Sequence, residues 1–104
     1  MRRTYQVQLE INERSLKEVI IDSHYEEKHT KSVNDTIILA LIQSLDKRRF
    51  EPEYVSPVGY EYYTSDPILH EDKPYRLVWL LHLDADYLGV VNCFRRSHGK
   101  NGNR

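Results

Sequence analysis

Apolar and polar residues alternate at the start of the chain. Between Tyr5 and Asn12 every second residue is apolar, which is the period-two pattern of a strand with one face in water. A turn at 12–14 follows, and the segment Leu16–Asp22 then predicts a strand that returns antiparallel to the first. The sequence therefore predicts an N-terminal β-hairpin.

One or two helices are predicted after this hairpin. The polar segment 23–29 predicts one or two helical turns, with Asp22 or Ser23 as the cap. A second helix is predicted to begin at Ser32, because the apolar residues after it recur at spacings of three and four. These residues are Ile37, Ile38, Leu41, Ile42 and Leu45. The bases of Asp46–Arg49 would lie in the last turn of this helix, where its carbonyl groups favour positive charge.

Three strands are predicted in the second half of the chain. Tyr60–Thr64 reads as a strand that ends before Asp66-Pro67, and Tyr75–His82 and Tyr87–Arg96 read as a hairpin with an acidic turn. Alternation would place Tyr75, Leu77, Trp79 and Leu81 on one face, and Arg76, Val78, Leu80 and His82 on the other. The predicted order is β-β-α-α-β-β-β. This is an α+β domain with a three-stranded antiparallel segment and its helices packed on one face of the sheet.

The length of 104 residues predicts one domain. We expect residues 1–96 to form it and residues 97–104 to be a flexible basic tail. The single cysteine, Cys93, lies in an apolar strand and cannot form an internal disulfide, which favours a buried thiol in a reducing, cytoplasmic setting. No apolar run approaches the roughly 18 residues that span a bilayer, so no membrane association is predicted.

The charges are nearly balanced but unevenly distributed. Fifteen Lys and Arg face sixteen Asp and Glu, for a net charge of −1. Residues 50–72 contain six acids and no Lys or Arg, whereas residues 93–104 contain four bases and no acid. This predicts an acidic and a basic region, with the alternative that both are ordinary solvated surface.

Several classes of site are disfavoured by the motifs that the chain lacks. Among the five histidines, His24 and His29 are five residues apart, which does not place them on one face of a helix, and no His-Glu-x-x-His pattern occurs. The chain also has no Gly-rich phosphate loop, no nucleophile elbow and no dinucleotide fingerprint. No metal and no cofactor are therefore predicted.

The remaining basic and aromatic residues would suit phosphodiester cleavage without a metal. Such a reaction needs a base for the 2′-hydroxyl, a cation for the phosphorane and an acid for the leaving oxygen. The catalytic candidates are His24, Lys28, Arg76, His82 and Arg95. Tyr87 and Arg96 are candidates for RNA binding, through stacking and phosphate contact.

Each candidate also has a structural interpretation. Arg95 and Arg96 are equally well read as solvated residues at a strand end, and His82 as a half-buried residue beside a turn. The tyrosines at positions 60, 62 and 63 are strand formers whose rings can pack on the helix. Trp79 is read as a core residue.

The segment order and two local patterns resemble the RelE/ParE-like toxin superfamily. His24–His29 with the helix after Ser32 is similar to its helical portion, and Lys73–Trp79 with Leu88–Arg95 is similar to its closing hairpin. The resemblance implies a metal-independent endoribonuclease that cuts RNA, including messenger RNA at the ribosome, and that a cognate antitoxin neutralises. It implies that Arg76, His82 and Arg95 contact the phosphate or transfer protons, with His24 and Lys28 facing the same cleft.

A second hypothesis is a non-catalytic protein-interaction module, antitoxin-like or accessory. It would bind through a sheet edge and a surface rich in tyrosine and acids. The two hypotheses differ in geometry. An enzyme requires its basic residues to line one concave site, whereas a binding module would scatter them and expose a tyrosine-rich patch.

Overall fold

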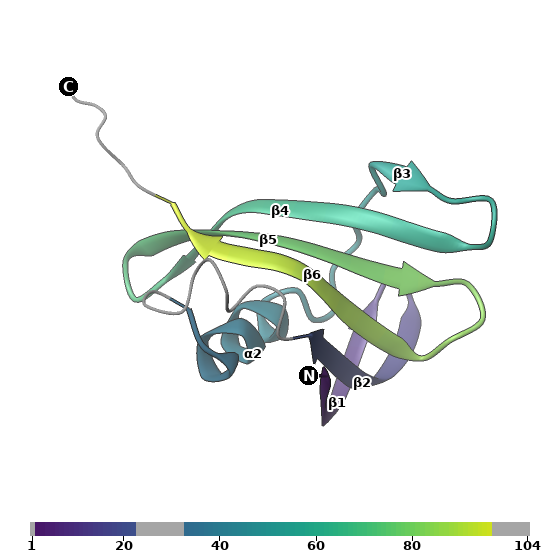
Figure 1. The fold of residues 1–104 in the computed structure, drawn as a ribbon, viewed down its shortest axis with the longest axis horizontal. Coiled ribbons are helices and arrows are strands. Elements are labelled where there is room, and N and C mark those ends of the chain that lie inside the picture. Colours follow the sequence, from purple (N-terminus) through teal and green to yellow (C-terminus); the bar gives the residue numbers. More distant parts are fainter. Residues whose placement is uncertain (1, 23–32, 97–104) are drawn as a thin grey trace.

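The computed structural model describes residues 2–22 and 33–96, which form one mixed six-stranded sheet and one helix (Figure 1). The elements are β1 (Arg2–Ile11), β2 (Arg14–Asp22), α2 (Asp35–Gln43), β3 (Tyr54–Val55), β4 (Tyr60–His70), β5 (Lys73–His82) and β6 (Tyr87–Arg95). The strand order is β1-β2-β6-β5-β4-β3. Neighbouring strands run antiparallel except β2 and β6, which pair in parallel. The predicted α+β class is confirmed.

The predicted hairpins are present, and the turn of the first one has a clear basis in its backbone. Asn12 and Glu13 both have positive φ, 54° and 64°. Two such residues between antiparallel strands match the right-handed twist of the pair, as in a type I′ turn. The predicted helix at 23–29, the proposed cap Ser32 and the tail 97–104 lie outside the described residues.

Helix α2 is shorter at both ends than the sequence predicts. Asn34 caps it, because its side-chain oxygen accepts a hydrogen bond from the Ile37 amide at 2.9 Å. The helix ends at Gln43, so the bases after Asp46 do not lie in its last turn. Lys47 instead has a φ of 65° and donates its amide to the Glu10 carbonyl in β1 at 2.6 Å, which draws the chain away from the helix axis. No helix among the described residues is long and apolar enough to span a membrane.

The Asn34 cap gives a stability prediction. Asn34→Ala should lower the free energy of unfolding by about 1 kcal/mol, because the Ile37 amide loses its side-chain acceptor. Asn34→Asp keeps an acceptor and should change it far less. Chemical denaturation of the three proteins measures the difference, and an unchanged midpoint for Asn34→Ala would show that the cap does not stabilise the helix.

Strand β4 is longer than predicted and is joined by a strand that the sequence did not indicate. The prediction that it ends before Asp66-Pro67 is wrong, since β4 continues to His70 and resumes pairing with β5 at Ile68. The Asp66-Pro67 peptide, which is cis, lies in a bulge between Ser65 and Ile68. A bulge takes the proline out of the ladder, where its missing N–H has no cost. The short strand β3 adds a fourth strand to the predicted three-stranded segment.

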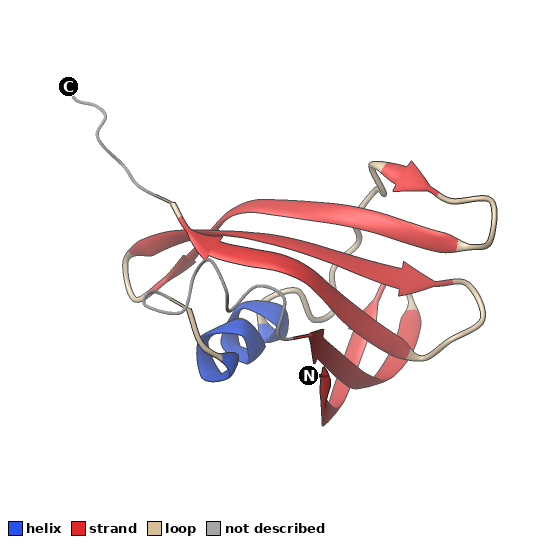
Figure 2. Ribbon diagram, viewed as in Figure 1, coloured by secondary structure: helices blue, strands red, loops and turns tan. Residues whose placement is uncertain are grey.

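The core lies between α2 and one face of the sheet (Figure 2). The predicted alternation in β5 is confirmed, since Tyr75, Leu77, Trp79 and Leu81 are all buried. The apolar stripe of α2 packs into the same cluster. Cys93 is fully buried there, and this burial raises the pKa of its thiol to about 12. Among the described residues no helix covers the opposite face, which carries Arg76, Val78, Leu80 and His82 of β5.

Candidate binding surface on the helix-free face of the sheet

A hollow of about 290 Å³ lies on this helix-free face. Leu80 and Gly89 form its floor, and the side chains of Tyr60, Tyr62 and Tyr87 stand around it. We call these five residues the tyrosine hollow. Ligand sites are typically concave and combine apolar surface with a few polar groups. In this hollow the apolar floor is bordered by tyrosine hydroxyls and by the charged residues Arg2 and Asp22, so its lining is more polar than is usual for such sites.

The strand register brings these residues together from three strands. Leu80 of β5 pairs with Tyr62 of β4 on one side and with Gly89 of β6 on the other. Cross-strand partners project to the same face of a sheet, so the floor and one wall are set by pairing. Gly89 keeps the floor low, because a Cβ atom at this position would lie 2.9 Å from Cδ1 of Leu80.

The hydroxyl groups of the hollow supply its polar contacts. Burial raises the pKa of Tyr87, as does a hydrogen bond with Tyr60, while the positive charge of Arg2 opposes the shift. The Tyr87 phenol is therefore protonated at neutral pH and can both donate and accept. At the rim, Arg2 pairs across strands with Asp22, so opposite charges border the hollow.

Exposed apolar side chains continue from the hollow to the nearby end of the sheet. Tyr54 of β3 lies against Tyr62 with ring centroids 6.0 Å apart. Val58 is exposed in the turn between β3 and β4, and Leu83 is exposed in the turn between β5 and β6. A hydrogen bond from the Leu83 amide to the Gly59 carbonyl, 3.1 Å long, joins the two turns. Large exposed apolar side chains near a hollow are typical of interaction sites.

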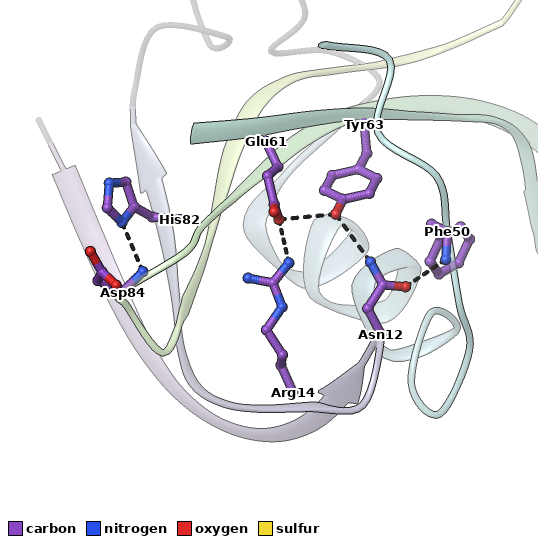
Figure 3. Close-up of polar contacts among 7 residues, drawn as sticks. All are labelled: Asn12, Arg14, Phe50, Glu61, Tyr63, His82 and Asp84. Carbon is purple, nitrogen blue, oxygen red and sulfur yellow. Dashed lines mark hydrogen bonds and ion pairs between the residues drawn. The ribbon is translucent and has the colours of Figure 1, made fainter. Parts of the chain in front are cut away.

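His82 holds these two turns together. Its Nδ1 accepts a hydrogen bond from the Asp84 amide at 3.1 Å (Figure 3), and its Nε2 lies 2.9 Å from the Val58 carbonyl. An acceptor Nδ1 assigns the proton to Nε2, which then donates to Val58. Its ring also packs edge-on against Tyr60, with centroids 4.6 Å apart. Both ring nitrogens are thus engaged in the structure, and the interpretation of His82 as a half-buried residue beside a turn is confirmed.

The arginines predicted as site residues lie at the other end of β5. Arg76 and Arg96 each donate from Nη1 to a different oxygen of Asp66, both at 2.9 Å. Burial acts to raise the pKa of Asp66, but the hydrogen bonds and charges of Arg96 and Arg76 outweigh it and hold that pKa below 3.8. Asp66 lies in the β4 bulge and was not singled out from the sequence as a site residue.

This carboxylate gives a pH-dependent prediction. The pKa of Asp66 is lower in the folded protein than its ordinary value of 3.8, so its pairing stabilises the fold above that value and the contribution is lost as pH falls through the folded pKa. The melting temperature of Asp66→Asn should therefore be below that of the wild type at pH 6, with the gap closing below pH ~3.8. A gap that is the same at both pH values would contradict the assignment.

The predicted catalytic residues do not gather at one site in the described chain. Arg76 and His82 are six residues apart on one strand, which separates them by about 20 Å. Arg95 pairs with Tyr75, whose side chain faces the core side, so Arg95 projects from the face opposite to Arg76. His24 and Lys28 lie outside the described residues. Of the two RNA-binding candidates, Tyr87 lines the hollow and Arg96 contacts Asp66.

A polar network on the helix side has a structural role (Figure 3). Glu61 forms an ion pair with Arg14 and accepts a hydrogen bond from Tyr63 at 3.2 Å, and the Asn12 side chain donates to the Tyr63 hydroxyl at 3.0 Å. Burial, followed by the negative charge of Glu61, raises the pKa of Tyr63. The network fastens the β1–β2 turn to β4. In the described part of the chain no group of three or more His, Cys, Asp or Glu residues could hold a metal ion.

The alternation of side chains along β4 could have indicated the hollow from the sequence. The structural interpretation of Tyr60, Tyr62 and Tyr63 was that their rings can pack on the helix, but only Tyr63 is buried in the core. Residues of even and odd number point to opposite faces of a strand. Tyr60 and Tyr62 therefore belong to the face opposite Tyr63, and strand alternation alone would have placed them there.

Comparisons with protein-family models, curated proteins and solved structures found no match for this chain. The resemblance to RelE/ParE-like toxins thus stays a prediction. The functional proposal below therefore rests on the geometry of the tyrosine hollow and the helix-free face.

Proposed function

We propose that this chain is a non-catalytic binding module that seats a large apolar side chain of a partner protein in the tyrosine hollow. The observation that carries the proposal is the hollow itself, with three tyrosines around an apolar floor on a sheet face that no described helix covers. Tyrosine provides large contact area at a small cost in side-chain entropy, and its hydroxyl can bond to a partner backbone. The volume of about 290 Å³ can hold one large side chain.

Charge favours a protein partner over a nucleic acid. A nucleic-acid surface needs a surplus of Lys and Arg to neutralise phosphates. Beside the hollow, Arg2 is the cross-strand register partner of Asp22, so one positive and one negative residue border it. Residues 50–72, which include all of β3 and β4 beside the hollow, contain no Lys or Arg. The local field is therefore close to balanced or acidic.

Selection of peptides displayed on phage tests this function. A random dodecapeptide library is selected on the full chain, and each selected peptide is then measured against Tyr62→Ala and Leu69→Ala. Leu69 is an exposed apolar residue, 71% accessible, on β4 near its far end, so it controls for loss of apolar surface elsewhere. We expect the selected peptides to share an aromatic or large aliphatic residue and to lose binding with Tyr62→Ala alone. Peptides that bind both variants equally well would contradict the proposal.

The ribonuclease hypothesis is tested separately with the same protein. Long single-stranded RNA is incubated with the full chain in EDTA, alongside His82→Ala and Arg95→Ala. Because the described basic residues are dispersed over two faces and both ends of β5, we expect the RNA to stay intact. Cleavage that both substitutions abolish would overturn the non-catalytic proposal and support the toxin-type nuclease.

A further inference from the structure

Arg76 and Arg96 form a second feature of the helix-free face. Arg76 lies on β5, Arg96 follows the end of β6, and both contact the same carboxylate of Asp66 in the β4 bulge. The Arg96 amide also donates to the Pro74 carbonyl at 2.8 Å, which fixes the backbone beside Arg76. The two guanidinium groups are thus held next to each other by contacts from three strands.

The cluster has charge and hydrogen-bonding capacity left over. Two guanidinium groups against one carboxylate leave a net charge of +1. The side chains of Arg76 and Arg96 are 39% and 49% exposed, whereas that of Asp66 is only 16% exposed. A guanidinium has five N–H donors, and within the described residues each arginine contacts Asp66 through Nη1 alone. The ion pair between Arg76 and Asp66 is enough to link β5 to β4. Arg96 adds a second positive charge that this link does not need.

The position of the cluster relates it to the tyrosine hollow. Arg76 and Leu80 are four residues apart on β5 and project to the same face, a separation of about 13 Å. An extended peptide covers that distance in four residues. Consider an extended segment that runs along β5 with one apolar side chain in the hollow. The side chain four residues further along that segment would then lie at Arg76 and Arg96.

We propose that Arg76 and Arg96 form an oxyanion subsite for an acidic side chain of the bound partner segment, four residues from the residue in the hollow. Paired arginines match the geometry of carboxylate and phosphate oxygens, and Asp66 orients them before the ligand arrives. The occupant is an extended protein segment that carries either a carboxylate or a phosphorylated hydroxyl. The role of this segment rests on the proposed function, whereas oxyanion binding by the arginines can be measured without it.

The first experiment measures the subsite alone. Nε–Hε signals of the arginines are followed by NMR while acetate or inorganic phosphate replaces chloride at constant ionic strength. We expect saturable shifts for Arg76 and Arg96 with at least one of the two anions. Arg49, whose side chain is 72% exposed, is the control for general screening and should shift little. Equal shifts at Arg49, or none at the pair, would overturn the subsite.

The second experiment joins the subsite to the hollow. Three capped peptides of sequence Trp-Gly-Ser-Gly-X, in which X is Glu, phosphoserine or Gln, are titrated against the full chain. We expect Glu or phosphoserine to bind at least tenfold more tightly than Gln, and Arg96→Gln to abolish the difference while Arg49→Gln keeps it. Which acidic peptide gains affinity identifies the source of the oxyanion.

The outcomes separate the two proposals. If the three peptides bind alike but all weaken with Tyr62→Ala, the subsite is wrong and the hollow function stands. If the acidic peptides depend on Arg96 but none depends on Tyr62, the subsite stands and the hollow function is wrong.

Discussion

Replacing Trp79 with alanine is expected to lower the free energy of unfolding by about 3–5 kcal/mol, which places it among the most destabilising single substitutions in the core. Trp79 is fully buried at the centre of the sheet. Its ring stacks on Tyr63 with centroids 4.2 Å apart and meets the edge of Phe50 at 5.4 Å. Its Nε1 donates to Ser65 Oγ at 3.0 Å. Denaturant unfolding measures the loss.

Two further variants separate packing from hydrogen bonding. Trp79→Phe keeps an aromatic ring but leaves Ser65 without its donor, and should cost less than Trp79→Ala. Ser65→Ala removes only the acceptor of the indole N–H, with an expected cost of about 1–2 kcal/mol. A Trp79→Ala loss as small as the Ser65→Ala loss would show that the stacked rings do not stabilise the core.

Replacing Tyr62 with alanine is expected to weaken the binding of a peptide selected on the wild-type chain about 30-fold, or about 2 kcal/mol, the range of an interface hot spot. Tyr62 lies between the floor residue Leu80 and the exposed ring of Tyr54. Its removal would open one wall of the hollow and leave the seated side chain partly in water. Isothermal titration calorimetry with the selected peptide gives the change in affinity.

The stability of the variant must be measured alongside its affinity. Tyr62 is half-buried on the helix-free face and is not part of the core cluster, so Tyr62→Ala should unfold close to the wild-type midpoint. Leu69→Ala should bind as the wild type does. An unchanged affinity for Tyr62→Ala, with both proteins folded, would remove the hollow from the binding surface.

The fold could largely be read from the sequence where a local pattern decides it. Alternation placed the faces of β5, and the spacing of Ile38, Leu41 and Ile42 gave the apolar face of the helix. The ends of the helix and strands were harder to predict from the sequence, because each end depends on a few individual contacts. Asn34 caps the helix, and the Lys47 amide donates to the Glu10 carbonyl of β1 instead of continuing the helix.

The candidate surface depended on pairings that no local pattern specifies. The parallel contact between β2 and β6 brings Ile20 beside Gly89, and the contact between β4 and β5 brings Tyr62 beside Leu80. Residues so distant in the sequence become neighbours only through the strand order. Arg76 and Arg96 were predicted as site residues, but their common partner Asp66 was not. Asp66 lies in a bulge of β4, at a point where the sequence predicted that the strand had already ended.

The one-sided core leaves the opposite face of the sheet free of any described helix, where a partner could bind. The core lies on one side of the sheet, so the half-buried and exposed side chains of the opposite face are available to contact a partner. A rigid sheet with a covered face positions the exposed side chains well, because its strands are held by pairing on both sides. Leu80 and Gly89 lie on central strands and are fixed in this way.

Amide chemical-shift mapping tests the central claim most directly. A peptide selected on the wild-type chain is titrated into ¹⁵N-labelled protein, and the perturbed residues are placed on the two faces of the sheet. We expect the largest changes at Tyr62, Leu80, Tyr87 and Gly89, with little change along α2. Changes concentrated on α2 or the β1–β2 turn, with the hollow unperturbed, would contradict the assignment of the helix-free face as the binding surface.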